Sequence, residues 1–279
     1  MSELQNPHGE LVARRKRMNR RKLLKATGAT VTNASLFGVA SAREGTKHGR
    51  SFEEHAAQAR KIREKTESQE RFVEYHRQHA DHVSHNRWKK KLPHHGSDKD
   101  DSDGPSNERL YSGESDVEIT VGYYLREDCG GEDYAQIDLH ADITTDQGGD
   151  GKPDKDNFAL AWNDDHYRYE DGTAYIDSCD NCSLRDRELN GVSWDWADGN
   201  ACYYSCDTSF ALGCHAELLP TDQERAIQAE HNHTWQEAEI TGVGFSSGGN
   251  ISVTVSSVDH WEELAYKIVE EPFDVESFC

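Results

Sequence analysis

The stretch "DVEITVGYYL", Asp116 to Leu125, places an apolar side chain at every second position from Val117 onward. The stretch "YAQIDLHADIT", Tyr134 to Thr144, repeats this alternation. Because successive side chains of a β-strand point to opposite faces, a period of two predicts strands that bury one face. Further strand candidates follow between Gly-, Asn- and Asp-rich breaks: "FALAWN" (158–163), "TAYID" (173–177), "GVSWDWA" (191–197), "SFALGCHAELL" (209–219), "TWQEAEITGVGF" (234–245) and "NISVTVSSV" (250–258). About eight short strands joined by turns predict an antiparallel β-sandwich over residues 117–279.

The chain upstream of these strands has a different composition. Residues 43–92 form a charged, His-rich region, and its part from Ser51 to about Lys91 has no Gly or Pro and many Glu, Arg, Gln and Ala, which predicts a long polar helix. With few apolar residues, this helix is expected to pack loosely or to project from the sandwich. Residues 93–116 are rich in Gly, Ser and Asp and predict a flexible acidic linker.

The first 42 residues have the features of an export signal. Arg20 and Arg21 precede a weakly apolar run, and Ala40-Ser41-Ala42 has the small-x-small form of a cleavage site. This arrangement resembles a twin-arginine signal peptide, although an ordinary amphipathic helix at a basic N-terminus is the simpler alternative. No later stretch approaches 18 apolar residues, so we expect no transmembrane segment after signal removal. The expected location is therefore outside the cell or on its surface.

Charge is distributed unevenly along the chain. Its net charge is −21, but residues 1–95 carry 21 Lys and Arg against 10 Asp and Glu, whereas residues 96–279 carry 10 against 42. Such self-repulsion opposes a folded state in dilute salt, and molar salt shortens the Debye length to about 3 Å and screens it. The sequence therefore predicts a protein of a halophile. The same negative charge argues against nucleic acid as a partner.

Several stretches carry a resemblance to a known group of proteins. "HNHTW" (231–235), "ITGVGFSSGGNISVTVSS" (240–257) and "DHW" (259–261) resemble the ending of a group of exported haloarchaeal proteins of unknown function. "DNFALAWNDDHYRY" (156–169) and "GVSWDWADGN" (191–200) resemble the middle strands of that group. The resemblance covers about residues 117–261 and implies a secreted all-β domain with no assigned catalytic residues. The cysteines of this chain are not part of the pattern.

Seven cysteines raise the question of disulfides or metal. Four of them, Cys179, Cys182, Cys202 and Cys206, have spacings that fit a four-thiolate zinc site. In an exported protein the same four residues can instead form disulfides, with Cys202 and Cys206 bonded to the loop between Cys179 and Cys182. We expect disulfides rather than zinc. Cys129 and Cys279 are the expected second pair, which leaves Cys214 as the free thiol.

Two weaker metal patterns accompany the cysteines. The stretch 146–157 partly fits a calcium loop, with candidate ligands Asp146, Asp150, Asp154 and Asp156, but it lacks the bidentate Glu at its last position. The simpler interpretation is a solvated hairpin loop. On the expected helix, His76, His79 and His82 recur at every third residue, and neighbouring pairs could share a transition metal. The simpler interpretation there is a solvated polar helix.

These observations do not define a molecular activity. The chain has no Gly-x-Ser-x-Gly elbow, no His-Glu-x-x-His pair and no phosphate-binding glycine loop. We therefore expect an exported binding or structural module that requires no cofactor, with an extracellular or surface partner. A secreted hydrolase that depends on a metal or on carboxylates is the alternative hypothesis. A secreted antimicrobial precursor, cleaved between its basic and cysteine-containing parts, is a second alternative.

Overall fold

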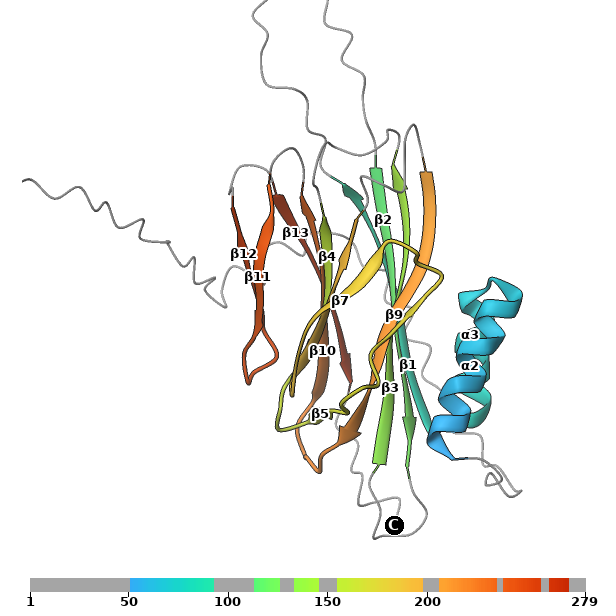
Figure 1. Ribbon diagram of the computed structural model, residues 1–279. Helices are drawn as coiled ribbons and strands as arrows, with labels where there is room; N and C mark the ends of the chain where they lie inside the picture. The colour runs from blue at the N-terminus through green and yellow to red at the C-terminus, as the bar shows by residue number, and fades with distance from the viewer. Residues whose placement is uncertain are drawn as a thin grey trace, which may run out of the picture. The chain divides into compact units, whose positions relative to one another are not determined.

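The computed structural model describes residues 51–92, 113–125, 133–145, 155–197, 206–234, 238–256 and 261–270. All of them belong to the larger of two units into which the chain divides, Lys47–Cys279. The described residues form two helices and thirteen strands (Figure 1). The mainly antiparallel β fold that the sequence predicts is confirmed, whereas the signal region 1–42 lies outside the described residues.

The first sheet has six strands in the order β1-β2-β3-β9-β5, with β6 also paired to β9. The strands are β1 (His82–Leu92), β2 (Gly113–Tyr124), β3 (Asp133–Thr145), β5 (Tyr167–Tyr169), β6 (Tyr175–Asp177) and β9 (Cys206–Leu218). Every pairing is antiparallel. Because β2 begins at Gly113, the end of the predicted linker 93–116 belongs to this sheet, and residues 93–112 lie outside the described part.

The second sheet has five strands in the order β13-β10-β4-β8-β7. They are β4 (Asp156–Trp162), β7 (Cys182–Glu188), β8 (Gly191–Trp196), β10 (Arg225–Thr234) and β13 (Trp261–Glu270). The strands β11 (Ile240–Phe245) and β12 (Ile251–Val255) pair only with each other and form a separate hairpin. This hairpin packs on the second sheet through Ile240 and Val243, which contact Ala159 of β4.

The core lies between the two sheets. Val117, Ile119 and Val121 of β2 are fully buried, and Trp162 and Trp194 of the second sheet are buried in the same cluster. Burying a side chain of this size contributes about 1.5–3 kcal/mol to stability. The alternation in the sequence therefore corresponds to the inner faces of a β-sandwich.

The helical region starts where the sequence predicts. Ser51 caps α2 (Phe52–Thr66): its hydroxyl accepts a hydrogen bond from the Glu54 N–H, and the Glu54 carboxylate accepts one from the Ser51 N–H. This reciprocal capping box satisfies two backbone donors. Helix α2 ends at Glu67, which adopts a left-handed conformation, and α3 (Gln69–His79) follows at once with Ser68 as its cap.

The helix predicted to extend to Lys91 is wrong beyond His79. Residues His82–Leu92 form the strand β1, which pairs with β2 along its whole length, from His82 opposite Tyr123 to Leu92 opposite Gly113. The absence of Gly and Pro permits a helix but does not require one. Here the backbone hydrogen bonds and the inward packing of Trp88 and Leu92 outweigh helix propensity.

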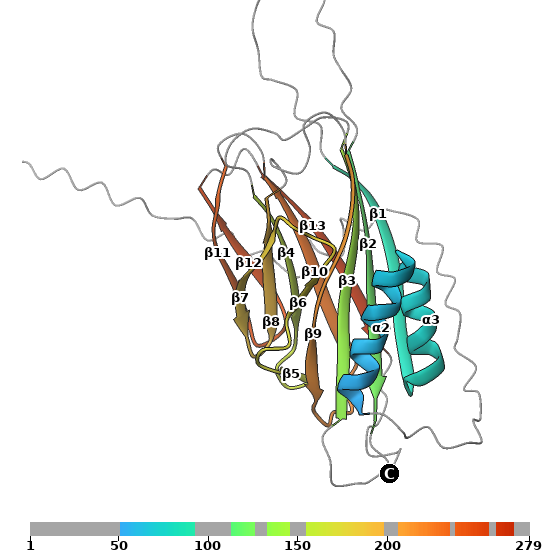
Figure 2. The same cartoon turned by 45° about the vertical axis from the view of Figure 1, so that its right-hand side comes forward.

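The two helices lie against the outer face of the first sheet, beside β1, β2 and β3 (Figure 2). On α2 the residues His55, Ala59 and Arg63 recur every four residues and are all buried, as are Phe72 and Val73 of α3. The prediction that this region packs loosely or projects is therefore also wrong. No helix among the described residues has the length and hydropathy to cross a membrane.

One side of the sandwich is closed where β1 and β13 lie next to each other. The Lys90 ammonium donates a hydrogen bond to the backbone carbonyl of Ala265. The same ammonium lies 4.3 Å from the centre of the Tyr266 ring. A lysine therefore bridges the edge strands of the two sheets.

Candidate functional site

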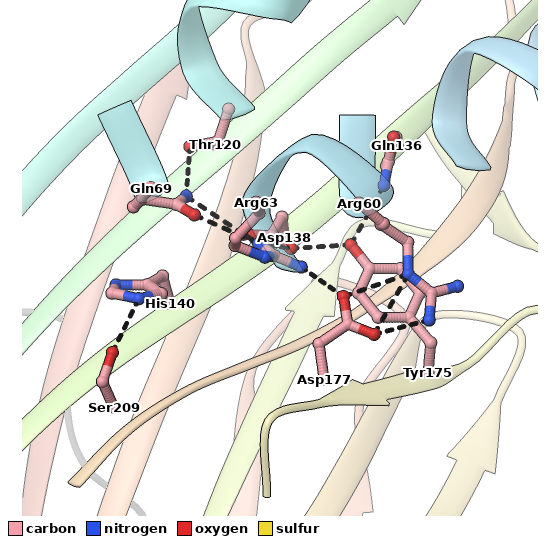
Figure 3. Close-up of polar contacts among 10 residues, drawn as sticks. All are labelled: Arg60, Arg63, Gln69, Thr120, Gln136, Asp138, His140, Tyr175, Asp177 and Ser209. Atoms are coloured by element: carbon pink, nitrogen blue, oxygen red, sulfur yellow. Dashed lines mark hydrogen bonds and ion pairs between the residues drawn. The ribbon is translucent and has the colours of Figure 1, made fainter. Parts of the chain in front are cut away.

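A cluster of buried charged side chains lies where the helices meet the first sheet (Figure 3). We call it the Arg63 cluster; its members are Arg60, Arg63, Gln69, Asp138, Tyr175 and Asp177. The Arg63 guanidinium donates to both carboxylate oxygens of Asp138, at 2.8 and 2.7 Å, and to Asp177 at 2.6 Å. Arg63 is 6 % exposed and Asp138 is fully buried. One arginine of α2 is thus joined to strands β3 and β6.

The remaining members complete the hydrogen bonding of these charges. The Tyr175 hydroxyl donates to Asp138 Oδ2 at 2.7 Å, and the Gln69 amide donates to Asp138 Oδ1 at 3.2 Å. Arg60 donates to both oxygens of Asp177, and its guanidinium lies 3.9 Å from the centre of the Tyr175 ring. A buried ion pair is tolerated only when its remaining donors and acceptors are satisfied, and here they are.

Burial and neighbouring charges act in opposite directions on the groups of the Arg63 cluster. Burial alone would lower the pKa of Arg63, but the charge of Asp138, the Tyr175 hydroxyl and the hydrogen bonds to Asp138 and Asp177 together raise it. Burial would raise the pKa of Asp177, but hydrogen bonds from Arg60 and Arg63 hold it low. Burial and the Asp138 charge raise the pKa of Tyr175 far above its usual range. The ion pairs of Arg63 thus join α2 to strands β3 and β6 through compensated charges.

His76 is fixed beside the cluster in a neutral form. It is fully buried, and its Nδ1 lies 2.8 Å from the Tyr124 hydroxyl. Burial, with the charge of Arg63 as a smaller cause, lowers the pKa of His76 to about 3. Gly122 of β2 makes room for the imidazole, because a Cβ at that position would lie 2.5 Å from His76 Nδ1.

The structure separates the histidines predicted as a metal site on a helix. His76 is buried, His79 is exposed at the end of α3, and His82 lies on β1, where its Nε2 is 2.8 Å from a Glu270 oxygen. A spacing of three residues places side chains on one face only within a helix, and His82 belongs to a strand.

The disulfide in the described residues joins cysteines that are closer in the sequence than the expected pairs. Cys179 and Cys182 are bonded to each other, not to Cys202 or Cys206. Cys214 is a free cysteine, fully buried on the inner face of β9. Cys206 begins β9, and Cys129, Cys202 and Cys279 lie outside the described residues. The predicted pair Cys129–Cys279 therefore stays a prediction, and the zinc site that was the alternative to disulfides would need the Cys179–Cys182 bond to be reduced.

The predicted calcium ligand Asp156 does not belong to an open loop. It is the first residue of β4, it is 1 % exposed, and its carboxylate turns into the interior. There it accepts a hydrogen bond from the Thr234 N–H at 2.9 Å and lies 2.8 Å from His231 Nε2 and 3.0 Å from His233 Nδ1. The other three candidates, Asp146, Asp150 and Asp154, lie outside the described residues.

A chain of hydrogen bonds continues from Asp156 through His231. The Tyr266 hydroxyl donates to Ser115 Oγ at 3.2 Å, and Ser115 Oγ lies 3.0 Å from His231 Nδ1. Since Ser115 accepts from Tyr266, its own proton is free to bond His231 Nδ1, and His231 Nε2–H then donates to Asp156. Burial lowers the pKa of His231, which agrees with this neutral form.

Serine, histidine and aspartate in hydrogen-bond contact are also the components of a hydrolase triad. Ser115 and His231 are both fully buried, between the two sheets. A nucleophile must reach the scissile carbonyl of its substrate, and this serine hydroxyl faces only protein. The arrangement therefore presents no nucleophile to a substrate in the conformation described.

Two groups of side chains among the described residues have metal-donor atoms within 4.8 Å of one another. One is Asp156, His231 and His233, and the other is Glu118, His140 and Asp142. In the second group His140 Nε2 lies 3.1 Å from Ser209 Oγ (Figure 3), and Arg87 pairs with Glu118 at 3.1 Å. Of these six residues the sequence interpretation singled out only Asp156. The sequence does offer His-x-His, a spacing that places both rings on one face of a strand, but the nearest strand candidate begins at Thr234, after both histidines.

Comparisons with known proteins give no family. No protein-family model and no curated protein matches the chain. Among solved structures, a "Pore forming protein" aligns at 9 % identity with a TM-score of 0.30, covering 68 % of this chain and 96 % of its own. The Clostridium perfringens delta-toxin aligns at 8 % identity and a TM-score of 0.34, covering 70 % and 92 %. The collagen-binding subdomain of the Enterococcus faecalis surface protein ACE aligns at 6 % identity with a TM-score of 0.27, covering 47 % of this chain and 86 % of its own. Likenesses this distant carry no functional argument.

Proposed function

We propose that the mature chain is an exported structural or binding module that acts outside the cell or at its surface in a salt-rich environment. The observation that carries this proposal is the Arg63 cluster. Its charged groups pair with one another and join α2 to β3 and β6. The Arg63 nitrogens lie 2.6 to 2.8 Å from the carboxylate oxygens of Asp138 and Asp177. Charged groups used in this way stiffen a scaffold instead of meeting a substrate.

Two further observations support a non-catalytic role over a secreted hydrolase. The hydroxyl of Ser115 and the imidazole of His231 are fully buried between the sheets. The carboxylates of Asp138 and Asp177 are already neutralised by arginines at hydrogen-bond distance. Arginine holds the pKa of Asp177 low, and a carboxylate of that kind is a poor general acid or base near pH 7.

The antimicrobial-precursor alternative conflicts with the pairing of β1. A cleavage between residues 93 and 110 would leave β1 hydrogen-bonded to β2 along its whole length. It would also leave Arg63 paired with Asp138 in the interior. Releasing the helical part would expose the sheet face beneath it, so the helices are better understood as a permanent layer of the sandwich.

Cell fractionation tests the proposed location. The full-length chain, expressed in its own producing organism, is expected in the envelope or medium with residue 43 as its first residue. A variant with Arg20→Lys and Arg21→Lys should stay in the cytoplasm with its signal attached. Recovery of the wild-type chain in the cytoplasm at full length would contradict export. Hydrolysis of envelope polymers by the purified chain, absent from a Ser115→Ala control, would favour the hydrolase instead.

Salt dependence tests the proposed environment. The acidic part of the chain, with 42 Asp and Glu against 10 Lys and Arg in residues 96–279, should lose its β-type circular dichroism on dialysis from molar KCl to dilute buffer. Retention of the full signal in dilute buffer would contradict adaptation to high salt.

A further inference from the structure

Strand geometry brings three metal-donor side chains together at one end of the second sheet. His231 and His233 are two residues apart on β10, so both rings point to the inner face. The neighbouring strand β4 pairs with β10 as far as Asn157 opposite Asn232, and Asp156 comes one residue beyond that pair, next to His233. We propose that Asp156, His231 and His233 form a binding site for one divalent transition-metal ion. This site is independent of the proposed surface role.

The donor atoms already converge. His231 Nε2 and His233 Nδ1 lie 2.8 and 3.0 Å from the same carboxylate oxygen, Asp156 Oδ2. A tetrahedral metal with bonds of 2.0 to 2.2 Å would separate its ligand atoms by about 3.4 Å. Each ring therefore has to withdraw by only roughly half an ångström, a change that side-chain rotation can supply.

The chemistry of the donors selects a class of metal. Two imidazoles and one carboxylate suit zinc, iron(II) and other first-row divalent ions, and they leave one coordination position for water. Calcium takes six to eight oxygen ligands, which this set does not provide. The acidic residue that the sequence suggests as a calcium ligand is thus better placed for a softer ion.

Neighbouring groups hold His231 and Asp156 in orientation, as metal sites require of their ligands. Ser115 Oγ lies against His231 Nδ1, and the Phe158 ring stacks on the same imidazole with ring centres 4.2 Å apart. The Thr234 N–H holds the second oxygen of Asp156 at 2.9 Å. With Nδ1 engaged by Ser115, His231 can present only Nε2 to the ion.

The other donor group, Glu118, His140 and Asp142, is the weaker candidate because a cation already occupies it. The Arg87 guanidinium lies 3.1 Å from Glu118 and 4.0 Å from Asp142. His85 Nε2 lies 2.9 Å from the other Glu118 oxygen. A metal there would have to displace an arginine and a histidine, so this group serves as the matched control.

Zinc titration tests the proposal on the wild-type chain. The exported protein, purified in molar KCl without a polyhistidine tag, is stripped with EDTA, dialysed and titrated with ZnCl₂. We expect saturation at one ion per chain in native mass spectrometry. We also expect a rise in Tm of about 5–10 °C when free zinc is 100 times Kd. CoCl₂ should give the intense visible absorption of a four-coordinate site. Absence of saturable zinc binding by the wild type would overturn the proposal.

Variants locate the ion. Asp156→Asn and His233→Gln, which keep the side-chain size, should each weaken zinc binding by at least about 100-fold, and Ser115→Ala by about 10-fold. Glu118→Gln should bind as the wild type does. Circular dichroism of each stripped variant shows whether it is folded. Zinc binding that survives both Asp156→Asn and His233→Gln, or that is lost in a Cys182→Ser variant, would place the ion elsewhere and refute the assignment.

Discussion

The outer faces of the two sheets are covered by opposite means. On the first sheet two helices are held by the Arg63 cluster, in which charged groups of α2, β3 and β6 meet. On the second sheet the β11–β12 hairpin is held mainly by apolar contacts, with Ile240 and Val243 packed on Ala159. An ion pair fixes one position and is costly when half of it is removed, whereas apolar packing loses energy in proportion to the contact removed.

The apolar cover also shows how closely its parts fit. The Phe245 ring lies directly over Gly191 of β8, where a Cβ would come within 2.2 Å of a ring carbon. Polar contacts add to this fit, since Arg185 donates to the Ile240 carbonyl at 2.6 Å and the Asp164 N–H donates to the Ser247 carbonyl at 3.1 Å. Buried ion pairs therefore join the helices to their sheet, in addition to apolar packing, whereas apolar packing and hydrogen bonds join the hairpin to its sheet.

The largest effect is expected from Asp138→Asn. This change leaves the Arg63 guanidinium buried with half of its compensating charge removed, and we expect a loss of about 3–5 kcal/mol in the free energy of unfolding. Urea unfolding in molar KCl measures it. The matched control is Asp171→Asn, because Asp171 is exposed and pairs with Arg187 at 3.5 Å, so its loss should stay below about 0.5 kcal/mol.

Replacing both partners of the Arg63–Asp138 pair separates the cost of an isolated charge from the cost of lost packing. Replacing both partners, Arg63→Met with Asp138→Leu, removes the buried charge instead of isolating it, and should recover at least about half of the stability lost in Asp138→Asn. If the double variant is as unstable as the single one, the cost lies in packing and the contrast between charged and apolar covers fails.

A smaller loss is expected from Ile240→Ala in the hairpin. The side chain is 3 % exposed, and its truncation should cost about 2–3 kcal/mol, because the hairpin can settle partly into the space left. The loss should be the same at pH 5 and pH 7, measured by urea unfolding. A loss that changed with pH would mean that charged groups also hold this cover.

The smallest effect is a dependence on pH that only the helical cover should show. The pKa of His76 is about 3 in the folded protein and about 6.5 when unfolded, so the unfolded chain binds more protons between these values. The stabilisation is fully present above pH 6.5 and decreases as the pH falls, by about 1.4 kcal/mol per pH unit. Burial also lowers the pKa of His215, to about 4, which adds to the slope.

The change that tests this slope is His76→Asn, which keeps a polar group near the Tyr124 hydroxyl. The variant should lose about 1 kcal/mol per pH unit of the slope between pH 4 and pH 6, whatever its stability at pH 7. The exposed His79→Asn on the same helix is the control and should leave the slope intact. An unchanged slope in His76→Asn would mean that His76 is protonated in the folded chain.

The strands with a clear apolar alternation were predictable because that signal is local, whereas β7 and β10 were not among the strand candidates. Val117 to Leu125 alternate within one segment, and no distant partner is needed to recognise them. The strand His82–Leu92 was missed because its outward positions are Arg and Lys and its partner β2 begins 21 residues further on. Its pairing with β2, not its composition, makes it a strand.

The candidate sites were less predictable for the same physical reason. Arg63 and Asp138 are 75 residues apart, as are Asp156 and His231, and only the folded sheets bring them together. The half of the second site that is local, His231 and His233, is a His-x-His pair in the sequence, but the strand that carries it, β10, was not predicted. The metal site predicted from histidine spacing was His76, His79 and His82, because a helix was expected there.

The lysine that bridges β1 and β13 has a consequence for how copies of this protein behave when concentrated. An outermost strand normally offers unpaired backbone groups to which another chain can add, which is the usual route to fibrils. Here Lys90 donates to the Ala265 carbonyl, and β1 exposes the charged side chains of Arg87, Lys89 and Lys91, of which Arg87 and Lys89 pair with Glu118 and Glu114. A second chain that met this side would have to displace the lysine and approach charged side chains, so this edge is protected against strand addition.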